Sequence, residues 1–177
     1  PVPSFRISQG RFEALDLGAL AGLPGQRTSL SGSLSATLQG ATWNRARGRL
    51  RLDVEPSAIN RATVSDGRLV VTADSGRADV DARLRTEQSG SMQMTGFAQD
   101  LNRTPTYRLT GSAGGLDAGA LAGLDAERPV RADTLQWTLD GRGVDPSTLR
   151  ASATVASGPL QVDRFELSGG RLEGRLR

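Results

Sequence analysis

The sequence predicts an all-β fold: a long, curled and mostly antiparallel sheet that forms an open, U-shaped groove with an apolar interior. Apolar residues recur at alternate positions in about a dozen short segments, which is the period of a strand with one buried and one wet face. Pairs rich in glycine, serine and aspartate separate these segments, as hairpins and short loops require. Helical patterns are confined to residues 15–23 and 116–124, too short to cover such a sheet. The sheet must therefore curl over itself or pair with a second sheet.

The alternating apolar sets follow one another along most of the chain. The residues between them are mainly polar or charged, as in Arg49, Arg51 and Asp53, and predict a wet outer face. Because the connections are short, we expect an antiparallel meander. In chain order the sets are Leu34, Ala36 and Leu38; Leu50, Leu52 and Val54; Leu69, Val71 and Ala73; Ala78, Val80, Ala82 and Leu84; Met92 and Met94; Tyr107 and Leu109; Leu135, Trp137 and Leu139; Ala151, Ala153 and Val155; Leu160 and Val162; and Phe165 and Leu167.

Two kinds of turn signal punctuate these sets. The motif apolar-Ser-x-Gly-Arg-apolar occurs at residues 7–12, 64–69 and 167–172, and we predict that each copy joins two strands in a hairpin whose glycine has a positive φ. Five dipeptides also predict hairpins or short loops: Asp66-Gly67, Ser75-Gly76, Ser89-Gly90, Gly114-Gly115 and Asp145-Pro146.

An internal repeat has an offset of 101 residues. Residues 15–23 recur as residues 116–124 with one difference, Leu17 against Ala118, and the same offset carries Leu34 to Leu135. A fixed period of this kind is typical of an extended array. We therefore interpret residues 1–177 as a fragment of a repetitive β-groove domain. Residues 1–14 end one repeat, residues 15–115 form a full one, and residues 116–177 begin the next.

The composition excludes most kinds of catalysis. The chain has no histidine and no cysteine, and all 22 basic residues are arginine, so a histidine base, a thiol nucleophile and a lysine Schiff base are all missing. Carboxylates at alternate positions, such as Asp79 and Asp81, are typical of a solvated strand face and match no metal-binding spacing. We expect no enzymatic activity, no cofactor and no metal.

Nucleic acid is not an expected partner either. Arg45, Arg47, Arg49 and Arg51 would line one side of a strand, but Asp53 continues the same row and no aromatic residues interleave for base stacking. The net charge is only +3. The row is therefore interpreted as a solvated face.

Several features together resemble the TamB and AsmA-like family of bacterial envelope proteins. They are the Leu-Asp-Leu-Gly-Ala-Leu turn at Leu15 with its copy at Leu116, the segment Leu30-Ser31-Gly32-Ser33-Leu34, the Gly-Arg-apolar motifs, and Tyr107-Arg108-Leu109-Thr110-Gly111. The resemblance implies a periplasmic protein, anchored in the inner membrane, whose taco-shaped sheet carries lipid towards the outer membrane. It also implies help with outer-membrane protein assembly beside a TamA-like outer-membrane barrel. No catalytic residues carry over from the family.

The predicted site is the apolar lining of the groove, which would hold phospholipid acyl chains. A closed β-sandwich that serves as a structural or adhesive module remains the alternative, although sandwich cores usually contain more large rings than an aromatic content of 4% allows. The predicted lining residues are Leu34, Leu38, Leu52, Val71, Val80, Leu84, Met94, Leu109, Leu135, Trp137, Leu139, Val155, Val162 and Leu167.

The two ends of the chain carry a further expectation. No apolar run is long enough to span a bilayer, and Pro1-Val2-Pro3-Ser4 has no signal-peptide pattern, so we expect the anchor to lie elsewhere in a longer parent protein. A segment of a continuous sheet has unpaired strand edges, here expected near residues 5–7 and 172–176. We therefore expect self-association through these edges.

Overall fold

The strands that the structure describes form one open, antiparallel β-sheet. The computed structural model describes residues 3–16, 19, 27–87, 90–117, 119–120, 130–143, 149–162 and 165–176. Among these residues all thirteen strands belong to one sheet, which confirms the predicted fold class and shows no second sheet of a sandwich. The elements are β1 (Ser4–Leu15), β2 (Thr28–Gln39), the 3₁₀ turn η1 (Trp43–Arg45), β3 (Arg47–Val54), β4 (Ser57–Ile59), β5 (Ala62–Asp74), β6 (Arg77–Thr86), β7 (Ser91–Gln99), β8 (Thr106–Asp117), β9 (Val130–Arg142), β10 (Arg150–Ser157), β11 (Leu160–Val162), β12 (Phe165–Leu167) and β13 (Gly170–Leu176).

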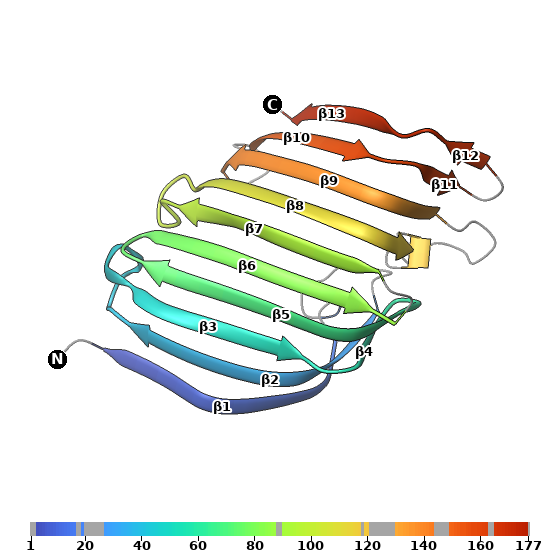
Figure 1. Ribbon diagram of the computed structural model, residues 1–177. Helices are drawn as coiled ribbons and strands as arrows, with labels where there is room; N and C mark the ends of the chain where they lie inside the picture. The colour runs from blue at the N-terminus through green and yellow to red at the C-terminus, as the bar shows by residue number, and fades with distance from the viewer. Residues whose placement is uncertain are drawn as a thin grey trace.

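The strands lie side by side almost in chain order. The order is β1-β2-β3-β5-β6-β7-β8-β9-β10-β13, so β1 and β13 form the two edges (Figure 1). The short strand β4 pairs with β2 and β5, and β11 pairs with β9 and β12. Neighbours are antiparallel because short connections return the chain beside the strand it has just left. The expected meander is therefore confirmed.

The turn predictions had mixed outcomes. Ser75-Gly76 is a two-residue hairpin between β5 and β6, with positive φ at both residues, 52° and 90°. Gly90 lies between β6 and β7, whereas Ser89 and the pair Asp145-Pro146 lie outside the described residues.

Two of the predicted hairpins are wrong. Asp66-Gly67 lies inside β5, where Gly67 pairs with Val54 on one side and Leu84 on the other. Gly114-Gly115 lies inside β8, and Gly115 has a φ of 60° without reversing the chain.

The Ser-x-Gly-Arg motif marks irregularities within strands and not hairpins. In β1 the pairing with β2 shifts by one residue between Ile7 and Gly10, and in β5 the pairing with β6 shifts between Val64 and Asp66. Such β-bulges bend a strand and increase its twist. The third copy spans the break between β12 and β13, where the positive φ belongs to Gly169 and not to the motif glycine. The prediction that each copy of the motif forms a hairpin is therefore wrong for the first two copies, which form bulges inside β1 and β5.

The most enclosed part of the protein is the end of the sheet near β4. Val64 is fully buried there, and Thr86 and Ala113 are also buried. The backbone N–H of Arg61, in the β4–β5 turn, donates to the carbonyl of Ala120 beyond β8, at 3.3 Å. Because β6 and β7 lie between β5 and β8 in the sheet, this contact bridges over their ends. We call this bridged end of the sheet, with the buried residues Val64, Thr86 and Ala113, the closed end.

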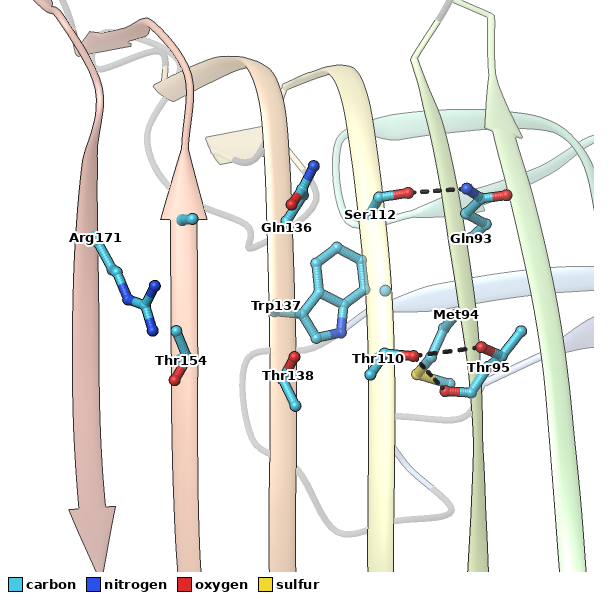
Figure 2. A pocket seen from close by; sticks show the side chains of 12 residues that line it. Gln93, Met94, Thr95, Thr110, Ser112, Gln136, Trp137, Thr138, Thr154 and Arg171 are labelled. Carbon is cyan, nitrogen blue, oxygen red and sulfur yellow. Dashed lines mark hydrogen bonds between the residues drawn. The ribbon is translucent and has the colours of Figure 1, made fainter.

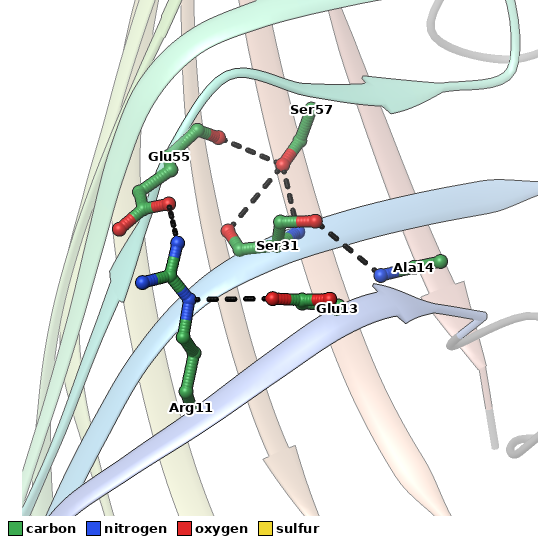
Figure 3. A network of polar contacts seen from close by, with 6 residues as sticks. All are labelled: Arg11, Glu13, Ala14, Ser31, Glu55 and Ser57. Carbon is green, nitrogen blue, oxygen red and sulfur yellow. Dashed lines mark hydrogen bonds and ion pairs between the residues drawn. The ribbon is translucent and has the colours of Figure 1, made fainter.

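A polar network holds the strands together at the same end (Figure 3). The Ser57 hydroxyl donates to the carbonyl of Glu55 at 2.7 Å and accepts from the N–H of Ser31 at 3.0 Å. Arg11 reaches Glu55 and Glu13 at 3.4 and 3.5 Å. The network ties β1, β2 and the β3–β4 connection at the bend.

The two predicted helical pieces fall mostly outside the described residues, since Leu15 ends β1 and residues 116–117 end β8. The copies nevertheless share one local contact. The Asp16 carboxylate accepts from the N–H of Ala19 at 3.1 Å, and the Asp117 carboxylate accepts from the N–H of Ala120 at 2.8 Å. A carboxylate that accepts from an N–H three residues later is typical of a helix start.

Gly32 in β2 provides a test of the packing. A Cβ at this position would collide with the Asp53 carbonyl of β3 and the Phe12 ring of β1, whereas a Cβ at Gly174 in β13 meets nothing within 4 Å. We expect Gly32→Ala to lower the free energy of unfolding by about 2 kcal/mol, and Gly174→Ala to change it by less than about 0.5 kcal/mol. Urea denaturation measures both. Equal effects would contradict the described contact between β2 and β3.

Candidate functional site

The strand register aligns the apolar residues into rows that cross the sheet. Residues paired between neighbouring strands point to the same side, so each row can be followed from β2 to β13. One row consists of Leu34, Leu52, Leu69, Ala82, Met94, Gly111, Trp137, Val155 and Leu172. The adjacent row consists of Ala36, Leu50, Val71, Val80, Gly96, Leu109, Leu139, Ala153 and Gly174. We call these two rows, with the rows that flank them, the apolar face.

The apolar face is long and uninterrupted. Nine strands spaced about 4.8 Å apart give each row a length of about 40 Å. No charged residue occurs in either of the two rows above. The face therefore offers a continuous apolar track at right angles to the strands.

The structure places twelve of the fourteen predicted lining residues on the apolar face. Leu38 lies in a flanking row beside Gly48, and Leu84 and Leu135 lie in the other flanking row, which contains Met92 and Ala113. The two exceptions lie in the outer strands. Val162 pairs with Val130 and Phe165, and its side chain lies outside the described residues, while Leu167 lies beyond the break at Gly169 and is 51% exposed.

On the apolar face, large aromatic side chains fill the space beside glycines of the neighbouring strands. The Trp137 ring occupies the space where Gly111 would carry a Cβ, and the Tyr107 ring does the same at Gly141. Most residues of the face, such as Leu50 and Leu109, are half-buried, because neighbouring side chains shield them from the sides but no second layer covers them within the described residues. The part of the chain that the structure describes therefore presents an apolar face without a covering layer.

The opposite face is a ladder of ion pairs. Asp53 accepts from Arg51 at 2.6 Å and from Arg68 at 2.8 Å, and Arg108 pairs with Asp140. The Arg77 guanidinium lies 4.0 Å from the centre of the Phe97 ring, which sits on this face. Opposite charges at neighbouring positions pair along this side, and most of these side chains are exposed to water. Sequence reasoning predicted such a wet outer face.

The ion pairs of Asp53 predict a small dependence of stability on pH. The hydrogen bond from Arg51, with a further one from Arg68, lowers the pKa of Asp53. These hydrogen bonds therefore stabilise the folded protein fully at pH values above the pKa of Asp53 in the unfolded chain, about 3.9. The stabilisation is lost as the pH falls through the lower pKa of Asp53 in the folded protein. Since the pair is largely exposed, we expect Asp53→Asn to cost about 0.5 kcal/mol at neutral pH. Urea denaturation at several pH values should show the deficit shrinking in acid; a deficit that grows would contradict this assignment.

A cavity of about 670 Å³ lies on the polar face of β7–β10 and β13. Figure 2 shows its lining of hydroxyl and amide side chains, among them Gln93, Thr110 and Thr138, together with Arg171. Met94 and Trp137 are the predicted lining residues that border it. Sequence reasoning did not anticipate this cavity, although the local replacement of Arg and Asp by Thr, Gln and Ser on β7–β9 was visible.

Within the described residues no helix is long and apolar enough to cross a membrane. The same residues contain no group of three or more acidic, histidine or cysteine side chains placed to hold a metal ion. Comparison of the chain with models of protein families, with curated proteins and with solved structures finds no match.

Proposed function

We propose that the chain is a lipid-conduit module whose apolar face carries phospholipid acyl chains while the headgroups stay in water. The observation that supports this proposal is the unbroken apolar track across nine strands, with no covering layer in the described residues. A contiguous uncovered apolar surface of this kind marks an interaction site.

Acyl chains suit the face better than polar ligands. A track of about 40 Å is longer than one acyl chain, which spans about half of a bilayer core about 30 Å thick. Shielding each CH₂ from water contributes about 0.8 kcal/mol, so binding is strong in sum yet not directional. Because the two rows present almost no hydrogen-bonding side chains, a bound chain can slide along them.

In the cell, this module would act in the periplasm as part of a larger protein anchored in the inner membrane, passing lipid between the inner and outer membranes. The resemblance to TamB and AsmA-like proteins supports this setting, a TamA-like barrel as a partner, and a role in outer-membrane protein assembly. Fractionation of cells that express the full parent protein tests the location: recovery in the cytosol would contradict it.

Lipid extraction from the purified protein tests the function itself. Mass spectrometry of the extract is expected to show phospholipid at a stoichiometry near or above one per chain. Delipidated protein is expected to bind an apolar dye, and added phospholipid should displace that dye. Protein that carries no lipid and binds no dye would refute the conduit.

A further inference from the structure

Two arginines face each other at the end of the sheet opposite the closed end. Arg142 ends β9, Arg150 begins β10, and the two are direct partners in the antiparallel register (Figure 1). Both are exposed, and neither has an ion pair within the described part of the chain. We call these two residues the arginine pair. Like charges at facing positions destabilise two neighbouring strands, so this contact needs an explanation.

A second pair of facing arginines shows how the same sheet neutralises such a contact. Arg68 in β5 faces Arg83 in β6. The Asp53 carboxylate lies 2.8 Å from Arg68, and the Asp81 carboxylate lies 3.7 Å from Arg83. Each of these arginines therefore has its own carboxylate, whereas the arginine pair has none among the residues that the structure describes.

The groups beside the arginine pair also leave room for an anion. Thr106 in β8 is the register partner of Arg142 on its other side, so their side chains point to the same face. The Thr106 hydroxyl is buried and has no hydrogen-bond partner among the described residues. Asp140, two residues before Arg142, pairs with Arg108 instead. A negatively charged group with several oxygen atoms, such as a phosphate, would satisfy both guanidinium groups and this hydroxyl.

The arginine pair lies next to the apolar face. Its neighbours Gly141 and Ala151 belong to a flanking row of that face, together with Tyr107. Leu139, in one of the two main rows, comes three residues before Arg142, which corresponds to about 10 Å along the strand. A lipid whose acyl chain lies on the apolar face can therefore place its headgroup at the strand end, beside the arginine pair.

We propose that Arg142 and Arg150 bind the phosphate of an anionic phospholipid whose acyl chains lie on the apolar face. This inference rests on the proposed lipid-conduit function and adds a headgroup class to it. A zwitterionic headgroup carries its own cation, which competes with the arginines for the phosphate, so an anionic headgroup binds more tightly. Bound lipid then has one orientation, with its headgroup at the end of the sheet opposite the closed end.

Two short-chain lipids with the same acyl chains test the headgroup preference. Dihexanoyl phosphatidylglycerol is anionic, dihexanoyl phosphatidylcholine is zwitterionic, and the displacement of an apolar dye measures the affinity of each. An arginine beside an anionic headgroup strengthens binding about fivefold, so we expect wild-type protein to bind the anionic lipid at least about tenfold more tightly. In Arg142→Gln/Arg150→Gln this preference should fall below about threefold, with the affinity for phosphatidylcholine unchanged. Added sodium chloride should also reduce the preference.

The matched control is Arg68→Gln/Arg83→Gln, which removes the same charge from the other facing pair and should keep the preference. Urea denaturation checks folding, and Arg142→Gln/Arg150→Gln should be at least as stable as wild type because two facing like charges are gone. Equal affinity of wild-type protein for the two lipids, or equal loss of preference in both double variants, would overturn the proposal and leave the conduit intact.

Inorganic phosphate separates a lipid headgroup from free phosphate as the ligand. Calorimetry should show that wild-type protein binds inorganic phosphate far more weakly than phosphatidylglycerol, because the free ion has no acyl chain for the apolar face. Equal affinities would overturn the headgroup assignment. Protein that binds neither lipid would contradict the conduit as well as the headgroup site.

Discussion

Replacing Leu109 with arginine is expected to weaken the binding of a fluorescent fatty acid by about tenfold or more. Leu109 lies in the middle of the apolar face, next to Leu139 in β9 and Gly96 in β7. A guanidinium there interrupts the apolar track. A bound acyl chain must then either displace water from the guanidinium, at a cost of several kcal/mol, or lose contact with this part of the face. Fluorescence titration measures the dissociation constant, and circular dichroism reports whether the sheet is retained.

Thr110→Arg is the matched control for this variant. Thr110 follows Leu109 in β8 but points to the polar face, where it is exposed and lies 3.4 Å from the Thr95 hydroxyl. The same charge enters at the neighbouring position on the opposite side, so fatty-acid affinity should change by less than about twofold. Equal loss of binding in the two variants, with folding intact, would show that the apolar face is not the site.

Val64→Asp is expected to unfold the closed end of the sheet. Val64 is the largest side chain that is fully buried among the described residues, and it lies in β5 three residues after Arg61, whose N–H contacts Ala120. A carboxylate without a partner in this position should lower the free energy of unfolding by at least about 3 kcal/mol.

Val71→Asp is the comparison on the same strand. Val71 is half-buried on the apolar face with no layer above it in the described residues, so a carboxylate there retains much of its water. We expect a loss below about 1.5 kcal/mol, measured like that of Val64→Asp by urea denaturation. If Val71→Asp is as damaging as Val64→Asp, the face around Val71 is closed, as in a sandwich core.

The fold prediction was based mainly on the alternation of apolar and polar residues along the sequence. A period of two assigns each side chain to a face from sequence alone, and it also selects the register, because a slip by one residue would turn Leu52 or Val80 to the wet side. For this reason the alternation predicts the rows of the apolar face, and the two exceptions, Val162 and Leu167, lie in the short outer strands β11 and β12.

The turns were less predictable because glycine has more than one use in a sheet. The local sequence around Gly67 suits a hairpin and a β-bulge equally well. The choice depends on distant strands: β6 pairs with β5 on both sides of the bulge, while β4 pairs with the first part of β5 and β3 with the second part. The bridge from Arg61 to Ala120 and the cavity beside Thr138 also arise from strands distant in the chain. Local patterns do not contain such contacts.

Photo-crosslinking along β6 tests the central claim most directly. A photoreactive residue is placed in turn at each position from Asp79 to Leu84, and crosslinked phospholipid is detected by mass spectrometry. Because neighbours in a strand face opposite sides, crosslinks are expected at Val80, Ala82 and Leu84 and not at Asp79, Asp81 and Arg83. Crosslinks without this alternation, or confined to the charged positions, would contradict lipid transport along the apolar face.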